Sequence, residues 1–112
     1  MPRRKRRVRK TQQAQPQTLA ISFVLRYADV EIHETAYKHG VSTFDIHHVC
    51  ANSSDIFELD QESYEIKILI VGPDSAGNLL EVIGLEKDDQ YFLIIHAMKV
   101  RKSIAKLIEG RL

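Results

Sequence analysis

The feature that most constrains the fold is a turn segment between two apolar segments. Residues 72–78 are dense in glycine, proline, aspartate, serine and asparagine, the residue types that form tight turns between strands. Before this turn, isoleucines alternate with other side chains over 64–71, and after it 79–86 is again rich in apolar side chains. Alternation is typical of strands, because successive side chains point to opposite faces of a sheet. The sequence therefore predicts an antiparallel β-hairpin.

Two further segments predict strands of the same sheet. Residues 55–59 form a short, largely apolar segment. Residues 91–96 are apolar on both faces, which is typical of a central strand. Together with the hairpin they predict a four-stranded antiparallel sheet in consecutive order. Residues 21–27 suit an entry strand or an extended segment, because they combine β-branched and aromatic side chains.

Three segments predict helices, two before the sheet and one after it. Asp29 can cap the first helix and Gly40 can end it, while the Ser42 hydroxyl can cap the second. The predicted ranges are 29–39, 42–51 and 99–112. The expected buried residues are Ile32 and Ala36, then Phe44, Ile46, Val49 and Cys50, then Val100, Ile104, Leu107 and Ile108, and the lysines Lys99, Lys102 and Lys106 are expected along another face of the third helix. The expected fold is a small α+β domain.

Charge divides the chain into two parts. The formal net charge of the 112 residues is +1, but residues 1–17 hold seven basic and no acidic residues, which leaves a net charge of −6 on residues 18–112. The first part has too few apolar side chains to fold, so we expect a disordered basic tail followed by one domain over 18–112. The tail could bind the phosphate backbone of a nucleic acid through Arg3, Arg4, Arg6 and Arg7. It could also be a solubilising extension or the product of a misassigned translation start.

The composition argues against several classes of protein. A single cysteine, Cys50, rules out an intramolecular disulfide and fits a reducing cytosol. We expect a cytoplasmic protein without a membrane span, because no apolar segment approaches ~20 residues. His47 and Cys50 are three residues apart, but no second pair is spaced to complete a zinc site, so we expect no metal. No nucleotide-binding glycine motif occurs, so we expect no cofactor.

Three motifs in a fixed order carry a resemblance to a known family. They are Tyr37-Lys38-His39-Gly40-Val41-Ser42, the turn and following strand at 72–82, and Ile95-His96-Ala97-Met98-Lys99-Val100-Arg101-Lys102. Over residues 27–102 the chain resembles the BrnT family, the ribonuclease toxins of bacterial type II toxin–antitoxin pairs. The resemblance implies a RelE-like fold and metal-independent cleavage of mRNA. It also implies a cognate antitoxin protein that covers the site and recruits the pair to operator DNA.

Metal-independent RNA cleavage needs a base, an acid and cations that stabilise the charge on the reacting phosphate. Histidine suits the first two roles and arginine the third. We therefore assign His96 as base or acid, with His39, Lys38 and Arg101 as the other catalytic residues. Lys99 and Lys102 are assigned to nucleic-acid binding. The alternatives stay open. His96 could be a core histidine bonded to a backbone carbonyl, and Lys38 and His39 could be cations that a helix end favours. Arg101, Lys99 and Lys102 could belong to a solvated helix face.

One departure from the family supports a second hypothesis. Toxins of this family typically carry a basic side chain where this chain has Met98, and Arg101 could replace it. Since the domain is also acidic, the chain could instead be a non-catalytic module that binds a protein partner and, through its tail, nucleic acid.

Overall fold

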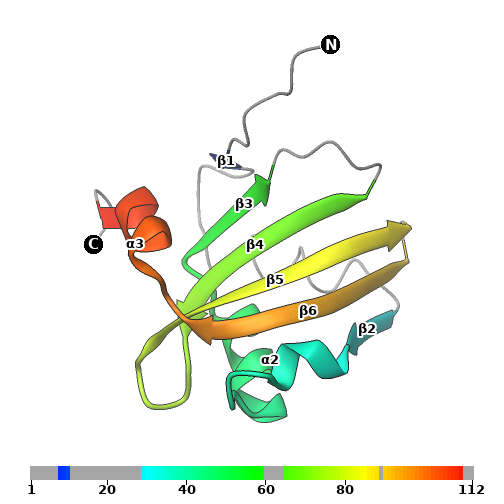
Figure 1. The fold of residues 1–112 in the computed structure, drawn as a ribbon, viewed down its shortest axis with the longest axis horizontal. Helices are drawn as coiled ribbons and strands as arrows, with labels where there is room; N and C mark the ends of the chain where they lie inside the picture. The colour runs from blue at the N-terminus through cyan, green and yellow to red at the C-terminus, as the bar shows by residue number, and fades with distance from the viewer. Residues whose placement is uncertain (1–7, 11–28, 60–64, 89, 110–112) are drawn as a thin grey trace.

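A computed structural model of the chain describes residues 8–10, 29–59, 65–88 and 90–109 (Figure 1). The α+β class is confirmed, but the predicted numbers of strands and helices are wrong. Six strands form one sheet in the order β1-β3-β4-β5-β6-β2. The elements are β1 Val8–Lys10, β2 Asp29–Ile32, the 3-10 helix η1 Glu34–Tyr37, α2 Thr43–Ala51, β3 Asp55–Leu59, β4 Ile66–Pro73, β5 Leu79–Asp88, β6 Tyr91–Lys99 and α3 Lys102–Ile108.

The predicted hairpin is confirmed as β4 and β5, which pair antiparallel from Ile66↔Glu86 to Pro73↔Leu79. Asp74 organises the turn, because its Oδ1 accepts hydrogen bonds from the amides of Ala76 and Asn78 at 2.9 and 2.8 Å. Gly77 adopts a φ of 90°, a left-handed conformation that glycine tolerates best. The turn residues therefore do what their chemistry predicts.

Helix α2 is also confirmed, with one error in its packing. The Ser42 hydroxyl accepts a hydrogen bond from the Asp45 amide at 3.1 Å, as expected of an N-cap. Ile46, Val49 and Cys50 are buried, but Phe44 is 67% exposed. Phe44 lies two residues before Ile46, about 200° around the helix, and so faces away from the sheet.

The predicted first helix, 29–39, is wrong over most of its length. Residues 29–32 form β2, which pairs parallel with the first half of β6, and only 34–37 are helical. As a strand, this segment packs both Val30 and Ile32 against the core. The His33 amide donates to the Ile94 carbonyl at 2.8 Å, which extends the pairing. The open edge of β6 thus outweighs the weak helical pattern.

The chain start shows a second difference. Residues 8–10 pair antiparallel with β3 as strand β1, so the expected disorder does not hold for these three residues. Strand β3 would otherwise present unpaired backbone groups at the sheet edge, and β1 supplies partners for them. The rest of the basic tail, with Arg3, Arg4, Arg6 and Arg7, and the expected strand at 21–27 lie outside the described residues.

The last strand is longer than predicted and the last helix is shorter. Strand β6 continues to Lys99, and α3 begins only at Lys102. The predicted lysine face is therefore wrong, because Lys99 belongs to a strand. Leu107 was expected to be buried but is 42% exposed, whereas Ile104 and Ile108 are buried as expected.

The sheet carries a different cover on each face (Figure 1). On the α2 face, apolar side chains of β4, β5 and β6 pack against Ala36 and α2; the buried set is Ala36, Ile46, Val49, Cys50, Ile56, Ile68, Ile70, Leu80, Val82, Phe92, Ile94 and Ala97. On the α3 face the buried set is smaller: Phe57, Leu59, Leu69, Val71, Ile104 and Ile108. The buried apolar side chains described on the α3 face therefore come from β3, β4 and α3, and none comes from β5 or β6.

Candidate functional site

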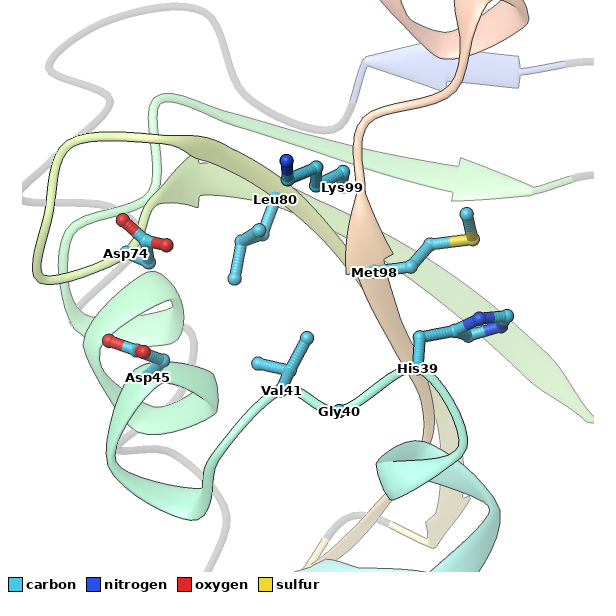
Figure 2. A pocket seen from close by; sticks show the side chains of 8 residues that line it. All are labelled: His39, Gly40, Val41, Asp45, Asp74, Leu80, Met98 and Lys99. Atoms are coloured by element: carbon cyan, nitrogen blue, oxygen red, sulfur yellow. The ribbon is translucent and has the colours of Figure 1, made fainter.

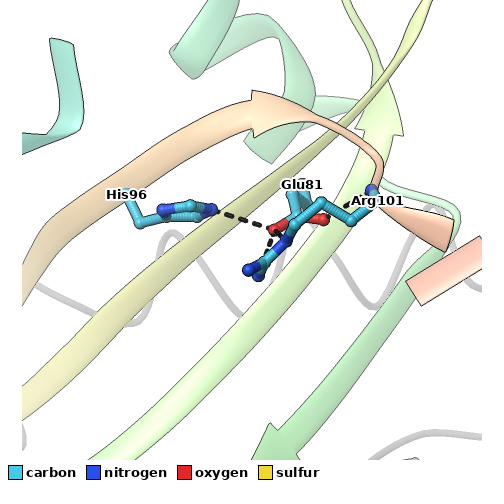
Figure 3. Close-up of polar contacts among 3 residues, drawn as sticks. All are labelled: Glu81, His96 and Arg101. Atoms are coloured by element: carbon cyan, nitrogen blue, oxygen red, sulfur yellow. Dashed lines mark hydrogen bonds and ion pairs between the residues drawn. The ribbon is translucent and has the colours of Figure 1, made fainter. Parts of the chain in front are cut away.

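A buried carboxylate lies on the α3 face of the sheet, near the start of β5. Glu81 is fully buried on β5, on the same side of the strand as Leu79 and Ile83. A buried charge is costly unless it is paired and hydrogen-bonded. Glu81 is both, since Arg101 and His96 contact it (Figure 3).

Arg101 approaches Glu81 with backbone and side chain together. Its amide donates to Glu81 Oε1 at 3.0 Å, its Nε donates to Oε2 at 2.8 Å, and its Nη2 lies 2.6 Å from Oε2. These contacts hold Arg101 as the residue before α3, in an extended conformation. Because a guanidinium has five N–H donors, three remain, and the side chain is 49% exposed. Arg101 can thus hold Glu81 and still contact a phosphate.

The charge of Glu81 depends on these partners. Burial raises the pKa of this carboxyl, but the hydrogen bonds from Arg101 and His96 and the charge of Arg101 outweigh burial, so the pKa of Glu81 is lowered from its ordinary value. Glu81 is therefore ionised at neutral pH and can only accept hydrogen bonds.

His96 lies within β6, not at its end as expected. Its Nε2 is 2.9 Å from Glu81 Oε2, and its side chain is 22% exposed. Next to it the strand carries a bulge: Ile83 pairs with His96 and Gly84 with Ile94, so Ile95 has no partner in β5. Bulges turn side chains toward new directions and are common beside active sites.

Gly84, beside the bulge, leaves room for the buried Phe92 ring. A Cβ at this position would lie 2.3 Å from the Phe92 ring, so a larger residue would displace the ring from the core. The bulge is fixed from the other edge of β6, because the Thr35 hydroxyl donates to the Ile95 carbonyl at 2.9 Å. The same bond places η1, and the loop after it, beside His96.

His39 completes the group. Its ring and that of His96 meet edge to face, with centroids 5.7 Å apart and an interplanar angle of 72°. Gly40, directly after it, has a φ of 82°, which turns the chain from η1 toward α2. We name the four residues His39, Glu81, His96 and Arg101 the Glu81 cluster.

In the described part of the chain, the other residues assigned from the sequence make no hydrogen bond or ion pair with the Glu81 cluster. Lys38 is exposed, and the described residues show no hydrogen bond or ion pair between its side chain and the cluster. Lys99 and Lys102 are exposed on either side of Arg101 in the chain. The amide of Arg101, the residue before α3, donates to Glu81. Three of the four catalytic candidates are therefore together, and Lys38 is not.

A cavity of about 380 Å³ opens beside His39 (Figure 2). Leu80 and Val41 point toward each other across it, so its walls are partly apolar. The remaining lining residues are Gly40, Asp45, Asp74, Met98 and Lys99. The Asp45 carboxylate accepts from the Ser75 amide at 2.9 Å, which ties α2 to the hairpin turn on the far side of this cavity.

Sequence reasoning missed Glu81 as a site residue. The signal was present: in Leu79-Leu80-Glu81-Val82-Ile83, a single acidic residue interrupts an apolar strand segment. Strand alternation places it on the same face as Leu79 and Ile83, where an unpaired carboxylate would be unfavourable. A carboxylate at this position needs a cationic or hydrogen-bonding partner, and that requirement could have identified Glu81 as a site residue.

The structure also bears on metal binding and on the reactivity of Cys50. In the described part of the chain, no three histidine, cysteine, aspartate or glutamate side chains are grouped as metal ligands would be. Burial raises the pKa of the Cys50 thiol to about 12, so it stays protonated and is a poor nucleophile.

Comparisons add no relative to this description. No helix among the described residues has the length and apolar character needed to cross a membrane. Protein-family models, curated proteins and solved structures give no significant match to the chain.

Proposed function

We propose that the protein is the toxin of a type II toxin–antitoxin pair, a BrnT-like, RelE-like endoribonuclease that cleaves mRNA in the cytoplasm without a metal. The observation that supports this function is the Glu81 cluster. Its two histidine rings lie 5.7 Å apart, and Arg101 shares the carboxylate partner of His96, so two proton-transfer groups and one phosphate-binding group lie in one place.

The chemistry follows from these three side chains. One histidine takes the proton of a ribose 2′-OH, and the resulting oxygen attacks the adjacent phosphorus. The bond to the 5′-oxygen breaks, the other histidine protonates that oxygen, and a 2′,3′-cyclic phosphate remains. The free N–H groups of Arg101 stabilise the additional negative charge on the phosphate in the transition state.

The test is cleavage of a defined single-stranded RNA by the purified full chain. We expect products that end in a cyclic phosphate, and a loss of about 100-fold or more in rate for His96→Ala, since one acid–base group contributes about that much. His47→Ala is the matched control, because His47 is an exposed histidine on α2. Intact RNA with folded wild-type protein, together with undiminished toxicity of His96→Ala on expression, would exclude this function.

A second candidate is a non-catalytic module that binds a protein partner and nucleic acid. Two observations favour it: residues 18–112 carry a net charge of −6, and Glu81 already occupies two of the Arg101 side-chain donors. If the protein is such a module, it binds RNA without cleaving it. Replacing Arg3, Arg4, Arg6 and Arg7 by glutamine then abolishes RNA binding, and unchanged affinity excludes this version.

A further inference from the structure

We infer that Glu81 is a positioning residue for RNA cleavage: it fixes His96 with the proton on Nε2, and thereby makes His96 Nδ1 the base that takes the 2′-OH proton. His39 is then the acid. This inference rests on the proposed function, but its first test does not depend on cleavage.

The first step is the position of Glu81. The strand neighbours on its face are apolar, and a buried ion pair seldom stabilises a protein more than apolar residues of the same size would. Both side chains that Glu81 binds were assigned to catalysis from the sequence, and they lie 15 and 20 residues away from it. A carboxylate that serves only to hold α3 on the sheet would need Arg101 alone.

The second step is the tautomer of His96. An ionised carboxylate only accepts hydrogen bonds, so Nε2 must donate the hydrogen in its 2.9 Å contact with Glu81. A neutral imidazole carries one hydrogen, which leaves a lone pair on Nδ1. Among the described residues Nδ1 has no hydrogen-bond partner. It is therefore the atom of His96 that can take a proton from a substrate.

The third step is the charge that develops during the reaction. When Nδ1 takes the proton, His96 becomes an imidazolium whose Nε2–H still faces the negative carboxylate. A carboxylate in this position stabilises the imidazolium and keeps the ring oriented, as the aspartate does in serine protease triads. The same carboxylate holds Arg101 by three contacts, so base and phosphate-binding group keep a fixed separation.

The first experiment measures the tautomer directly in the wild-type protein. In ¹⁵N-labelled full chain, long-range ¹H–¹⁵N correlations of the His96 ring distinguish a protonated Nε2 from a protonated Nδ1, and loss of the signals in His96→Gln assigns them. We expect the proton on Nε2. A proton on Nδ1, or rapid exchange between the two tautomers, overturns the inference whether or not RNA is cleaved.

The second experiment replaces the carboxylate by its amide. Glu81→Gln keeps the size of the side chain but turns one acceptor into an –NH₂ group, which opposes one of the donors now bound. We expect mixed His96 tautomers and a fall in cleavage rate of about 100-fold or more. The matched control Glu109→Gln removes an exposed carboxylate just after α3 and is expected to leave both readouts unchanged.

The outcomes separate this inference from the proposed function. If wild-type protein cleaves RNA and a folded Glu81→Gln variant cleaves equally fast, the positioning role is excluded and the function stands. If wild-type protein leaves RNA intact, the function fails, and with it the catalytic role of Glu81, even when Nε2 carries the proton. If Glu81→Gln does not fold, the wild-type tautomer decides the inference.

Discussion

The two faces of the sheet bury different kinds of side chain. On the α2 face the buried side chains of β4, β5 and β6 are apolar, whereas on the α3 face Glu81 is buried between Leu79 and Ile83. The first face gains its stability from apolar area removed from water. The α3 face buries less apolar area and holds the charged Glu81, whose partners His96 and Arg101 are partly exposed. The α2 face therefore holds most of the apolar core, and the α3 face holds the Glu81 cluster.

The largest effect is expected from the α2 face. Phe92→Ala removes a fully buried ring and should lower the free energy of unfolding by about 3–5 kcal/mol. Phe44→Ala, in contrast, removes a ring that is 67% exposed, and should change it by less than about 0.5 kcal/mol. Urea unfolding measures both, and similar losses would contradict the assignment of the core to this face.

The next effect concerns the α3 face and Met98, at whose position the toxins that the chain resembles typically carry a basic side chain. Arg101→Ala should slow RNA cleavage by about 100-fold, equivalent to about 2.7 kcal/mol of transition-state stabilisation. Met98 lies opposite Glu81 in the pairing of β5 and β6, so an arginine there starts from the same face as the carboxylate. The double variant Arg101→Ala/Met98→Arg should regain much of the rate.

Two controls complete this comparison. Lys106→Ala removes an exposed charge elsewhere on α3 and should leave the rate within a few-fold of wild type. Failure of Met98→Arg to restore any activity in a folded double variant would show that Arg101 acts only from its own backbone position.

A smaller effect is expected in the dependence of stability on pH. Because the pKa of Glu81 is lowered in the folded protein, its contribution to stability is complete above the ordinary value of 4.5 and is lost as the pH falls below it. Wild-type protein should therefore lose stability below pH 4.5 more steeply than Glu81→Gln. Urea unfolding at a series of pH values tests this, and parallel curves would mean that Glu81 is not ionised in the folded state.

The smallest effect is local. Ser42→Ala removes the hydroxyl that caps α2 at 3.1 Å from the Asp45 amide and should cost about 1 kcal/mol. Ser103→Ala, within α3, has no cap to lose and should cost less. Equal thermal shifts for the two variants would argue against the cap.

Local chemistry explains which elements could be predicted. The hairpin of β4 and β5 and the start of α2 follow from alternation, turn residues and an N-cap serine, which act over a few neighbouring residues. Residues 29–32 were assigned to a helix because Ile32 and Ala36 have helical spacing. What they form was decided by the open edge of β6, more than fifty residues later in the chain.

The candidate site shows the same division. His96, Arg101 and His39 could be proposed from residue type and from resemblance, because histidine and arginine suit RNA cleavage wherever they occur. Their contact could not be predicted. It depends on the bulge at Ile95 and on the path of the chain from β6 into α3.

By itself, therefore, the sequence determined the antiparallel hairpin, the turn and cap residues, and the residue types available for chemistry, since each depends on near neighbours in the chain. Only the tertiary structure decided that Glu81 is buried and that it binds both His96 and Arg101. The physical reason is that a buried carboxylate is stable only where distant donors converge, and that convergence depends on sheet register and helix placement.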